Sequence, residues 1–421
     1  MMGNQSKMQG EKAIPAGYKL TEVGVIPGDW EVASLQDISS KITDGTHDTP
    51  KPAREGIPFL TAIHVKDGRI DFDSCYFLPE KIHNEIYCRC NPEFGDILMV
   101  NIGSGTATTA VVNVSYEFSL KNVALIKPRN TFSGFYINYA LSFSKTKIIE
   151  TISTGGAQPF LSLSQISQLR VAKPSFEEQT AIANVLSDTD ALITELEKLI
   201  AKKQAIKTAT MQQLLTGRTR LPQFAKHPDG TLKGHRSSEL GSIPDNWQVV
   251  PFKDVLTIKH GKNQKEVESP SGKYPIYATG GQIGNATSFL FDKPSVLIGR
   301  KGTIDKPKYA DTPFWTVDTL FYSEIKKNVC VKFIYYKFCM IDWMQYNEAS
   351  GVPSLNAHTI ENVLVVLPNM EEQTAIATVL SDMDAELEAL EQKLSKARDI
   401  KQGMMQQLLT GRIRLPLDQQ P

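Results

Sequence analysis

A segment of 46 residues occurs twice in this chain and constrains its fold more than any other feature of the sequence. Residues 177–222 align without a gap with residues 371–416, and 29 of the 46 positions are identical. Both copies open with EEQTAIA and close with TGRxRLP. Similar helix composition alone does not produce this identity, so we interpret the pair as an internal duplication.

Each copy carries signals for one long helix. Ser175 followed by Glu178 has the spacing of a capping box, and Asn369 followed by Glu372 repeats it. Proline precedes both caps and glycine closes both segments, at Pro174, Pro368, Gly217 and Gly411. The signals predict helices over residues 174–217 and 368–411, each about 40 residues or roughly 60 Å long.

Apolar residues recur along both helices at intervals of three and four, which is coiled-coil spacing. Polar residues interrupt this pattern at Lys203 and Glu386. The pattern favours two copies that pair along their length, although two core helices of separate globular domains would also fit. The expected seam consists of Ile182, Val185, Leu192, Leu196, Leu199, Ile206 and Leu214, then Ile376, Val379, Met383, Leu387, Leu390, Leu394, Ile400, Met404 and Leu408.

A second repeat gives the domain plan. Residues 17–38 match residues 234–255 around IPGDW and IPDNW, at an offset of 217 rather than 194. Trp30 and Trp247 lie in this shared part, so we expect them to be core anchors. The predicted plan is a polar tail (1–16), a first domain (17–173), a helix (174–217), a linker (218–233), a second domain (234–367), a helix (368–411) and a tail (412–421).

The two middle regions barely match each other, and both are rich in strand signals. Short apolar or alternating runs between Gly, Pro and Asn predict strands within residues 57–65, 95–103, 122–128, 274–284, 295–304 and 314–325. One amphipathic helix is expected in each middle, at residues 135–152 and 331–347. The predicted class is α+β, with two β-rich domains and two long helices.

Composition narrows the function classes. Forty-six basic and 46 acidic residues cancel, whereas a free-standing nucleic-acid binder is usually basic, so such a role calls for segregated charge or a partner. Five scattered cysteines fit a reduced cytoplasmic compartment. Cys88 and Cys90 lack the spacing and the second pair of a zinc site. The sequence has no run of eighteen apolar residues, so no membrane span is predicted.

No catalytic constellation is evident in the sequence. Residues 91–94 read NPEF, which resembles the Asn-Pro-Pro-aromatic signature of amino-methyltransferases but is broken by Glu93. No Walker-type phosphate loop occurs. The middles instead contain polar, Gly-rich loops with basic residues, which suit close approach to a sugar–phosphate backbone and contacts to base edges. Solvated turns between strands would have the same composition.

Taken together, these motifs resemble the specificity subunit of type I restriction–modification systems. The resemblance covers residues 17–416 and rests on both EEQTAIA and QQLLTGRxRLP segments, both entry motifs, and KHPDGTLKG, TDGTHDTP, FDKPSVLIGRKGTIDKP and FWTVDTLFY. It implies two target recognition domains, separated by two helices that pair antiparallel, as a pseudo-twofold internal duplication. Each domain would read one half of a bipartite, asymmetric DNA target, with half-sites about one helical turn (roughly 34 Å) apart.

The resemblance also implies partners and a non-catalytic role for this chain. Two methyltransferase subunits would carry S-adenosylmethionine, and two restriction or motor subunits would use ATP and Mg²⁺. The alternatives are a self-contained DNA methyltransferase or nuclease, and a coiled-coil adaptor that binds protein without reading DNA.

Two sets of site residues follow. The expected DNA contacts are Thr43, Asp44, Thr46, His47, Ser104, Thr106, Gln158, Gln282, Asn285, Arg300, Lys301, Thr303 and Ser354, with Arg300 the strongest candidate for a guanine or phosphate contact. The expected docking residues, chosen because they recur in both copies, are Glu178, Gln179, Gln213, Glu372, Gln373 and Gln407. No metal or catalytic residue is expected.

Overall fold

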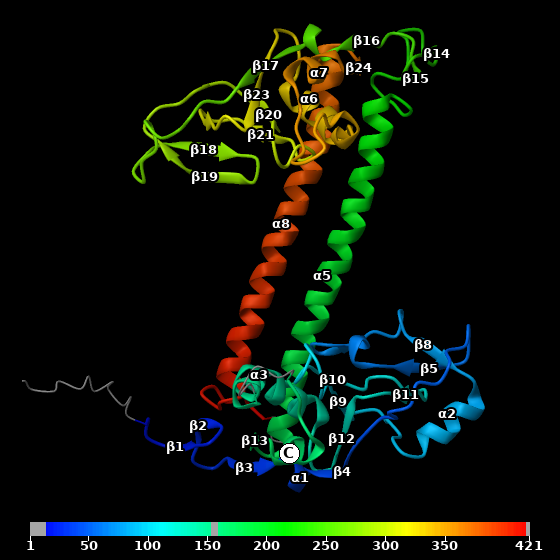
Figure 1. Cartoon of the computed structure of the whole chain (residues 1–421), viewed down its shortest axis with the longest axis vertical. Coiled ribbons are helices and arrows are strands. Elements are labelled where there is room, and N and C mark those ends of the chain that lie inside the picture. The colour runs from blue at the N-terminus through cyan, green and yellow to red at the C-terminus, as the bar shows by residue number, and fades with distance from the viewer. Residues whose placement is uncertain (1–13, 153–158, 418–421) are drawn as a thin grey trace, which may run out of the picture. The chain divides into compact units, whose positions relative to one another are not determined.

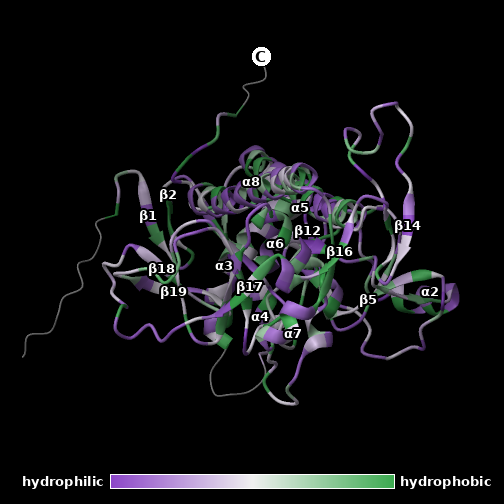
Figure 2. Cartoon of the chain, turned by 90° about the horizontal axis from the view of Figure 1, so that it is seen from above, coloured by the Kyte–Doolittle hydropathy of each residue, from purple (hydrophilic) through white to green (hydrophobic). Residues whose placement is uncertain are grey.

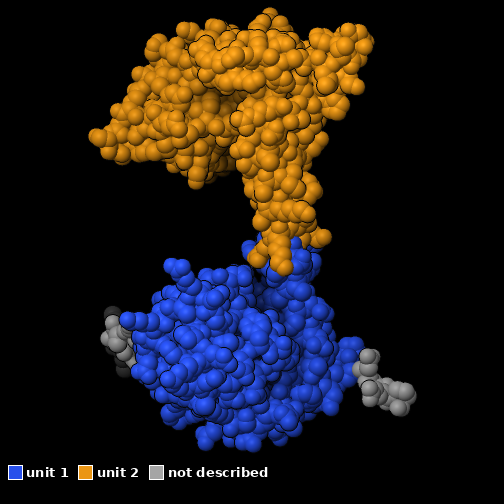
Figure 3. All heavy atoms as spheres, turned by 90° about the vertical axis from the view of Figure 1, so that its right-hand side faces the viewer, with its two compact units in different colours: residues 1–195, 394–421 blue, residues 196–393 orange. Residues whose placement is uncertain are grey.

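The computed structural model describes residues 14–152 and 159–417 and divides the chain into two compact units. Unit 1 comprises residues 1–195 and 394–421, and unit 2 comprises residues 196–393 (Figure 3). Each unit therefore contains one middle region and one half of each long helix. This division differs from the predicted domain boundaries, which assigned each helix whole. Among the described residues, no helix is long and apolar enough to cross a membrane.

Each unit contains a four-stranded antiparallel sheet of the same topology. In unit 1 the order is β10-β9-β12-β4, and in unit 2 it is β21-β20-β23-β17 (Figure 1). The strands are β4 (Ser39–Asp44), β9 (Ile97–Met99), β10 (Thr109–Val111), β12 (Ala124–Pro128), β17 (Leu256–His260), β20 (Ser295–Gly299), β21 (Lys308–Ala310) and β23 (Leu320–Ile325).

A three-stranded sheet accompanies the four-stranded one in each unit, in the orders β11-β5-β8 and β19-β18-β22. Its strands are β5 (Ile57–Leu60), β8 (Tyr76–Leu78), β11 (Ser119–Leu120), β18 (Tyr274–Ala278), β19 (Gly281–Ala286) and β22 (Trp315–Thr316). In both sheets one strand pair is parallel, β5 with β11 and β18 with β22. Both middles are therefore versions of one α+β domain, although their sequences have diverged.

The entry motifs form the same small elements in both units. Each gives a hairpin, β1 (Tyr18–Thr21) with β2 (Gly24–Pro27) and β14 (His235–Ser238) with β15 (Gly241–Pro244). The next strand pairs with the strand just before the long helix: β3 (Glu31–Ser34) with β13 (Arg170–Lys173), and β16 (Gln248–Pro251) with β24 (Leu364–Leu367). Other short elements are β6 (Val65–Lys66), β7 (Arg69–Ile70), α1 (Leu35–Ile38), α2 (Glu80–Tyr87), α4 (Leu163–Gln168), α7 (Ala357–Asn362), η1 (Ala62–His64) and η2 (Phe252–Asp254).

The helices predicted in the middles are present, but the second is shorter than expected. Helix α3 covers Gly134–Ile152, whereas α6 covers only Val331–Met340. Helix α6 ends because Ile341 is extended, and a 3₁₀ helix, η3 (Trp343–Tyr346), follows. The side chain of Asp342 caps η3 by accepting a hydrogen bond from the amide of Met344.

The two long helices are α5 (Phe176–Thr216) and α8 (Met370–Leu408), and they pair antiparallel within each unit. In unit 1, Asp190 accepts from Lys401 at 2.6 Å, while Thr189 lies by Met404. In unit 2, Lys207 binds Asp384, and the two residues that interrupt the apolar pattern, Lys203 and Glu386, bind each other at 2.6 Å. The predicted pairing is thus confirmed, and its polar interruptions are matched across the helices.

The seam between the helices is narrower than the spacing predicted. Leu196, Leu387 and Ala397 are buried in the middle stretch, but Leu192, Leu199, Ile206 and Ile400 are 38–48% exposed. These four were assigned to the seam, and that part of the prediction is wrong. Two helices alone cover only one stripe of each other, so the rest of each helix surface stays in solvent. Figure 2, which is seen from above, shows both hydrophilic and hydrophobic residues on α5 and α8.

Both faces of each four-stranded sheet are buried. Along β9, Ile97 and Met99 face the core formed with α3 and the start of α5, while Leu98 faces a second core shared with the small sheet. Val296 and Leu297 of β20 divide in the same way. Trp30 and Trp247 are each 1% exposed within the helix-side cores, which confirms them as core anchors.

Candidate functional site

The loop that follows β9 in unit 1 and the loop that follows β20 in unit 2 occupy equivalent places. The amide of Leu161 donates to the carbonyl of Asn101 at 2.8 Å, and the amide of Leu355 donates to the carbonyl of Arg300 at 2.9 Å. Two glycine amides repeat the match, from Gly103 to Pro159 O and from Gly302 to Pro353 O. Asn101 and Arg300 are therefore equivalent positions with different chemistry.

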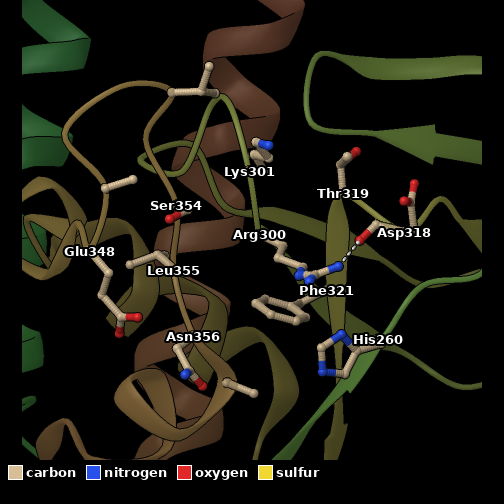
Figure 4. Close-up of a pocket in the computed structure, with 13 residues that line it drawn as sticks. His260, Arg300, Lys301, Asp318, Thr319, Phe321, Glu348, Ser354, Leu355 and Asn356 are labelled. Atoms are coloured by element: carbon tan, nitrogen blue, oxygen red, sulfur yellow. Dashed lines mark hydrogen bonds between the residues drawn. The ribbon is translucent and has the colours of Figure 1, made fainter.

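In unit 2 this loop borders a cavity of about 920 Å³ that is open to solvent (Figure 4). The ends of β17 and β20, the start of β23 and the loop before α7 surround it. Three predicted residues, Arg300, Lys301 and Ser354, line this cavity, and Lys301 forms a β-bridge with Ser354. The other lining residues are His260, Asp318, Thr319, Phe321, Glu348, Ala349, Val352, Leu355, Asn356 and Ala357.

Arg300 is held at the edge of an aromatic floor. Its Nη1 donates to the backbone carbonyl of Asp318 at 3.3 Å, and its amide donates to the carbonyl of Thr319. His260 meets the ring of Phe321 edge-on, with ring centroids 4.9 Å apart, and Figure 4 shows the guanidinium beside both rings. Arg300 has no ion-pair partner within the described part of the chain, and it lines the cavity.

Unit 1 has a different polar cluster at the same edge of its sheet. Asp44 pairs with Ala124 as His260 pairs with Phe321, so Asp44 takes the place of His260. Its carboxylate, which is largely buried, accepts from Arg89 at 2.7 Å and lies 3.1 Å from Nε2 of His47.

A neighbouring turn completes the unit 1 cluster. Nδ1 of His47 is 2.8 Å from Oδ1 of Asn122, which has a positive φ of 51°. Lys121 reaches the hydroxyl of Thr49, and Thr46 forms a β-bridge with Lys121. The structure thus brings predicted residues Asp44, Thr46 and His47 together.

The parts of the chain that are identical in the two copies form a matching polar clasp in each unit. In unit 1, Glu178 at the start of α5 accepts from Trp30 Nε1 at 3.1 Å and from the guanidinium of Arg414, which also binds Asp29. In unit 2 the equivalent residues are Glu372, Trp247, Arg220 and Asn246, with the same contacts. Each clasp joins an entry motif, the start of one long helix and the segment that follows the other.

Glycines at the helix ends let these segments approach closely. Gly217 and Gly411 have φ of 75° and 63°, in the left-handed region that side chains rarely adopt. A Cβ on Gly411 would lie 2.4 Å from Pro27 and 3.1 Å from Trp30, and a Cβ on Gly217 would meet Pro244 and Trp247 in the same way.

Comparison with known proteins agrees with this duplicated arrangement. The model of the type I restriction modification DNA specificity domain matches residues 27–208 and again residues 244–397, well over half of the chain. The chain belongs to this specificity-domain family. It carries the family's domain twice, and each match includes one of the two equivalent loops and most of one long helix.

Relatives and solved structures match nearly the whole chain. A Methanocaldococcus jannaschii protein whose name is that of a type I restriction enzyme MjaX specificity subunit is 28% identical over 94% of this chain and 97% of its own length. The MjaVIII specificity subunit of the same organism is 25% identical over 93% and 94%. The crystal structure of a type I restriction–modification S subunit from M. genitalium shares the fold, with a TM-score of 0.64, 17% identity and coverage of 90% and 96%.

Four of the expected docking residues are buried in the protein. Glu178, Gln179, Glu372 and Gln373 are at most 3% exposed. The two glutamates form the clasps. Gln179 accepts from the amide of Ser133, and Gln373 accepts from the amide of Cys330. The expectation of an exposed docking face at these four is therefore wrong, because the clasp and the backbone amides use the polar atoms.

The capping boxes are only half formed for the same reason. Ser175 and Asn369 cap their helices by accepting from the amides of Glu178 and Glu372. The glutamate side chains do not reach back to the caps but turn inward to the tryptophan and arginine. Gln213 remains exposed, with Oε1 accepting from Thr219, and Gln407 is half-buried.

Several expected DNA contacts lie away from the two clusters. Thr106 is 2% exposed and donates to the carbonyls of Gly103 and Pro159, so it shapes the loop rather than facing solvent, and its expected role as a contact is wrong. Gln282 and Asn285 bond each other on β19, outside the cavity lining. Ser104 and Thr303 lie within the two equivalent loops, Thr43 pairs with Leu125 within the sheet, and Gln158 lies outside the described residues.

Sequence reasoning missed both the clasp arginines and half of each reading cluster. Arg220 and Arg414 lay in segments assigned as linker and tail, although their recurrence in RxRLP was a usable signal. No such signal marks Lys121, Asn122, His260 and Asp318, which the pairing of the strands brings to the sheet edge, or Arg89, which comes from the turn after α2.

Proposed function

We propose that this chain is the DNA-specificity subunit of a type I restriction–modification complex, and that each unit reads one half of a split, asymmetric target. One observation carries the proposal. The two units keep the same clasp and the same sheet topology, yet they differ at the sheet edge. Unit 1 has Asp44 and Asn101 at the positions where unit 2 has His260 and Arg300. A common scaffold with two different polar sites suits two different half-sites, with the paired helices setting their spacing.

The residue types at these edges suit base reading in a groove. Arginine is a donor fork for guanine, asparagine and histidine contact base edges, and aspartate accepts from cytosine N4. Exposed lysines such as Lys301 supply phosphate contacts that position the protein but carry no sequence information.

Specificity subunits of type I systems are themselves non-catalytic, and the family does not imply a cofactor on this chain. We infer that S-adenosylmethionine belongs to the methyltransferase partners, and ATP with Mg²⁺ to restriction or motor partners. The complex would act in the cytoplasm, where its DNA lies. Partner surfaces would also supply the positive charge that a chain with 46 acidic and 46 basic residues lacks.

An exposed stripe on each long helix supports a pair of methyltransferase subunits. At 3.6 residues per turn, six positions that are identical in both copies fall within a sector of about 60°, and all of their side chains are exposed except that of Gln407, which is half-buried. Internal packing does not explain their identity, whereas two copies of one partner require two copies of one surface. The stripe consists of Glu177, Asp188, Ala191, Lys202, Ile206 and Gln213 on α5, and Glu371, Asp382, Ala385, Lys396, Ile400 and Gln407 on α8.

The recognition role is tested by mapping DNA methylation genome-wide with the gene intact and deleted. A split, asymmetric methylated motif that disappears on deletion is expected. An unchanged methylation pattern, with the partner methyltransferase expressed, would overturn the role. An adaptor that binds only protein would further show no salt-dependent DNA affinity in the reconstituted complex.

The docking stripe is tested with Ile206→Glu and Ile400→Glu, whose side chains are 43% and 48% exposed. A new charge in an apolar contact blocks docking without disturbing a core. Each single variant should retain one methyltransferase per chain and the double variant none, as measured by mass photometry of the purified complex.

Gln204→Glu, on the opposite side of α5, is the matched control and should retain two methyltransferases. Two methyltransferases on the Ile206→Glu, Ile400→Glu double variant would refute the assignment of this stripe.

A further inference from the structure

Two residues with complementary hydrogen-bonding groups, an arginine and an aspartate, line the cavity of unit 2. Arg300 and Asp318 both line it, and the backbone carbonyl of Asp318 positions the Arg300 guanidinium at 3.3 Å. We propose that unit 2 reads a G·C base pair here, with Arg300 donating to guanine O6 and N7 and Asp318 accepting from N4 of the paired cytosine. This assignment rests on the proposed function, because it names one base pair of the half-site that unit 2 reads.

Guanine, rather than a phosphate, fits the surroundings of Arg300. The carboxylates of Asp318 and Glu348 line the same cavity and would repel a phosphate, whereas cytosine N4 supplies a donor for a carboxylate. Glu348 accepts from the hydroxyl of Thr359, whereas Asp318 directly adjoins Arg300, so Asp318 is the acceptor beside the donor fork.

The orientation of the guanidinium also favours a base. Bidentate recognition needs a planar fork held in one direction, and Arg300 is held by the Asp318 carbonyl beside the rings of Phe321 and His260 (Figure 4). A phosphate contact needs only a nearby charge, and the exposed neighbour Lys301 meets that need.

The proposed contact is specific to one half of the target. Unit 1 has Asn101 at the position of Arg300. The turn before β12, which corresponds to the turn that contains Asp318, contains Lys121 instead, so neither the donor fork nor the carboxylate is repeated there. A change at Arg300 should therefore alter one half-site and leave the other as it was.

The experiment is methylome sequencing of a gene-deleted host complemented with the wild-type chain, Arg300→Ala or Asp318→Asn. Arg300→Ala should relax one position, a G·C pair, in one half-site. The reconstituted complex should lose roughly 5- to 150-fold of its preference for that base pair over the other three, the range of one bidentate contact. Asp318→Asn should weaken discrimination at the same position.

Lys301→Ala is the matched control in the same loop. It should weaken binding to all sequences alike and reduce the salt dependence, without relaxing any base. Retention of the two methyltransferases and an unchanged melting temperature would show that Arg300→Ala is folded.

Different results overturn different claims. A uniform loss of affinity in Arg300→Ala, relaxation at an A·T pair, or an unchanged motif would overturn the G·C assignment while the wild-type motif upholds the proposed function. The absence of any split motif in the wild-type strain would overturn the proposed function, and the assignment with it.

Discussion

Lys337 is a buried charged residue at which the cores of the two units differ. It is 6% exposed, its Nζ donates to the carbonyl of Leu215 near the end of α5 at 2.5 Å, and it lies over the rings of Trp247 and Phe333. Ala140 takes its place in unit 1, since Tyr139 and Tyr336, the preceding residues, make the same bonds to Asp190 and Asp384. Burial lowers the pKa of Lys337 to about 7.

This burial predicts a pH-dependent stability for unit 2. Between about pH 7 and the ordinary lysine value of 10.5, the unfolded chain binds a proton that the folded chain does not, so stability should rise with pH across that window. Lys337→Met should lose this rise. Urea unfolding of both proteins at several pH values from 7 to 10 measures it, and the difference between the two cancels the other titrating groups. Parallel curves for the two proteins would contradict the prediction.

At the scale of elements, the long helices are joined by matched charges as well as by apolar contacts. Lys203 and Glu386 are bonded to each other at 2.6 Å with side chains 33% and 48% exposed, and Lys207 and Lys401 repeat one ion-pair position in the two units. Partly exposed pairs stabilise weakly but penalise a wrong alignment by bringing like charges together. The charges therefore help to set the direction and register of the pairing.

A charge swap tests this view of the helix pairing. Lys203→Glu should destabilise unit 2 by up to about 1 kcal/mol, because it places two carboxylates side by side. Adding Glu386→Lys should restore most of the loss, and a double-mutant cycle from urea unfolding measures the coupling. Additive effects of the two changes would mean that the pair contributes nothing to register.

At the scale of the whole molecule, each unit has its own pair of cores and its own clasp. The clasp of unit 2 is the more deeply buried, with side-chain exposure of 4% for Arg220 and 1% for Glu372, whereas Arg414 in unit 1 is 43% exposed. Removing one partner of a buried pair leaves an uncompensated charge, which costs about 3–5 kcal/mol. The two units should therefore respond very differently to loss of their clasps.

The prediction is that Glu372→Gln lowers the melting temperature of unit 2 strongly and that of unit 1 little. Differential scanning calorimetry measures the transitions. The fluorescence of variants that retain only Trp30 or only Trp247 then assigns each transition to a unit. Glu178→Gln is the matched variant and should shift unit 1 by less, since solvent screens Arg414. A single transition that moves equally in both variants would show that the units unfold together.

The sequence by itself determined the duplicated plan of this protein. Local signals are enough for that: the caps and glycines bound α5 and α8 to within a few residues, and 29 identities required one scaffold twice. Strand patterns located β9, β12, β20 and β23, which are half of the strands of the two four-stranded sheets. Even the polar interruptions at Lys203 and Glu386 were visible as exceptions, although their pairing was not.

Only the tertiary structure decided what the repeated residues do. Glu178 and Glu372 carry the same letters whether they face a partner or a buried arginine, and the arginine lies 236 residues away in one case and 152 in the other. The two polar clusters depend likewise on contacts between distant parts of the chain, which bring Asp44 to Arg89, His47 to Asn122, and Arg300 to Asp318 and His260. Burial and long-range contacts assign these roles, because a side chain's chemistry is set by its neighbours in space and not by those along the chain.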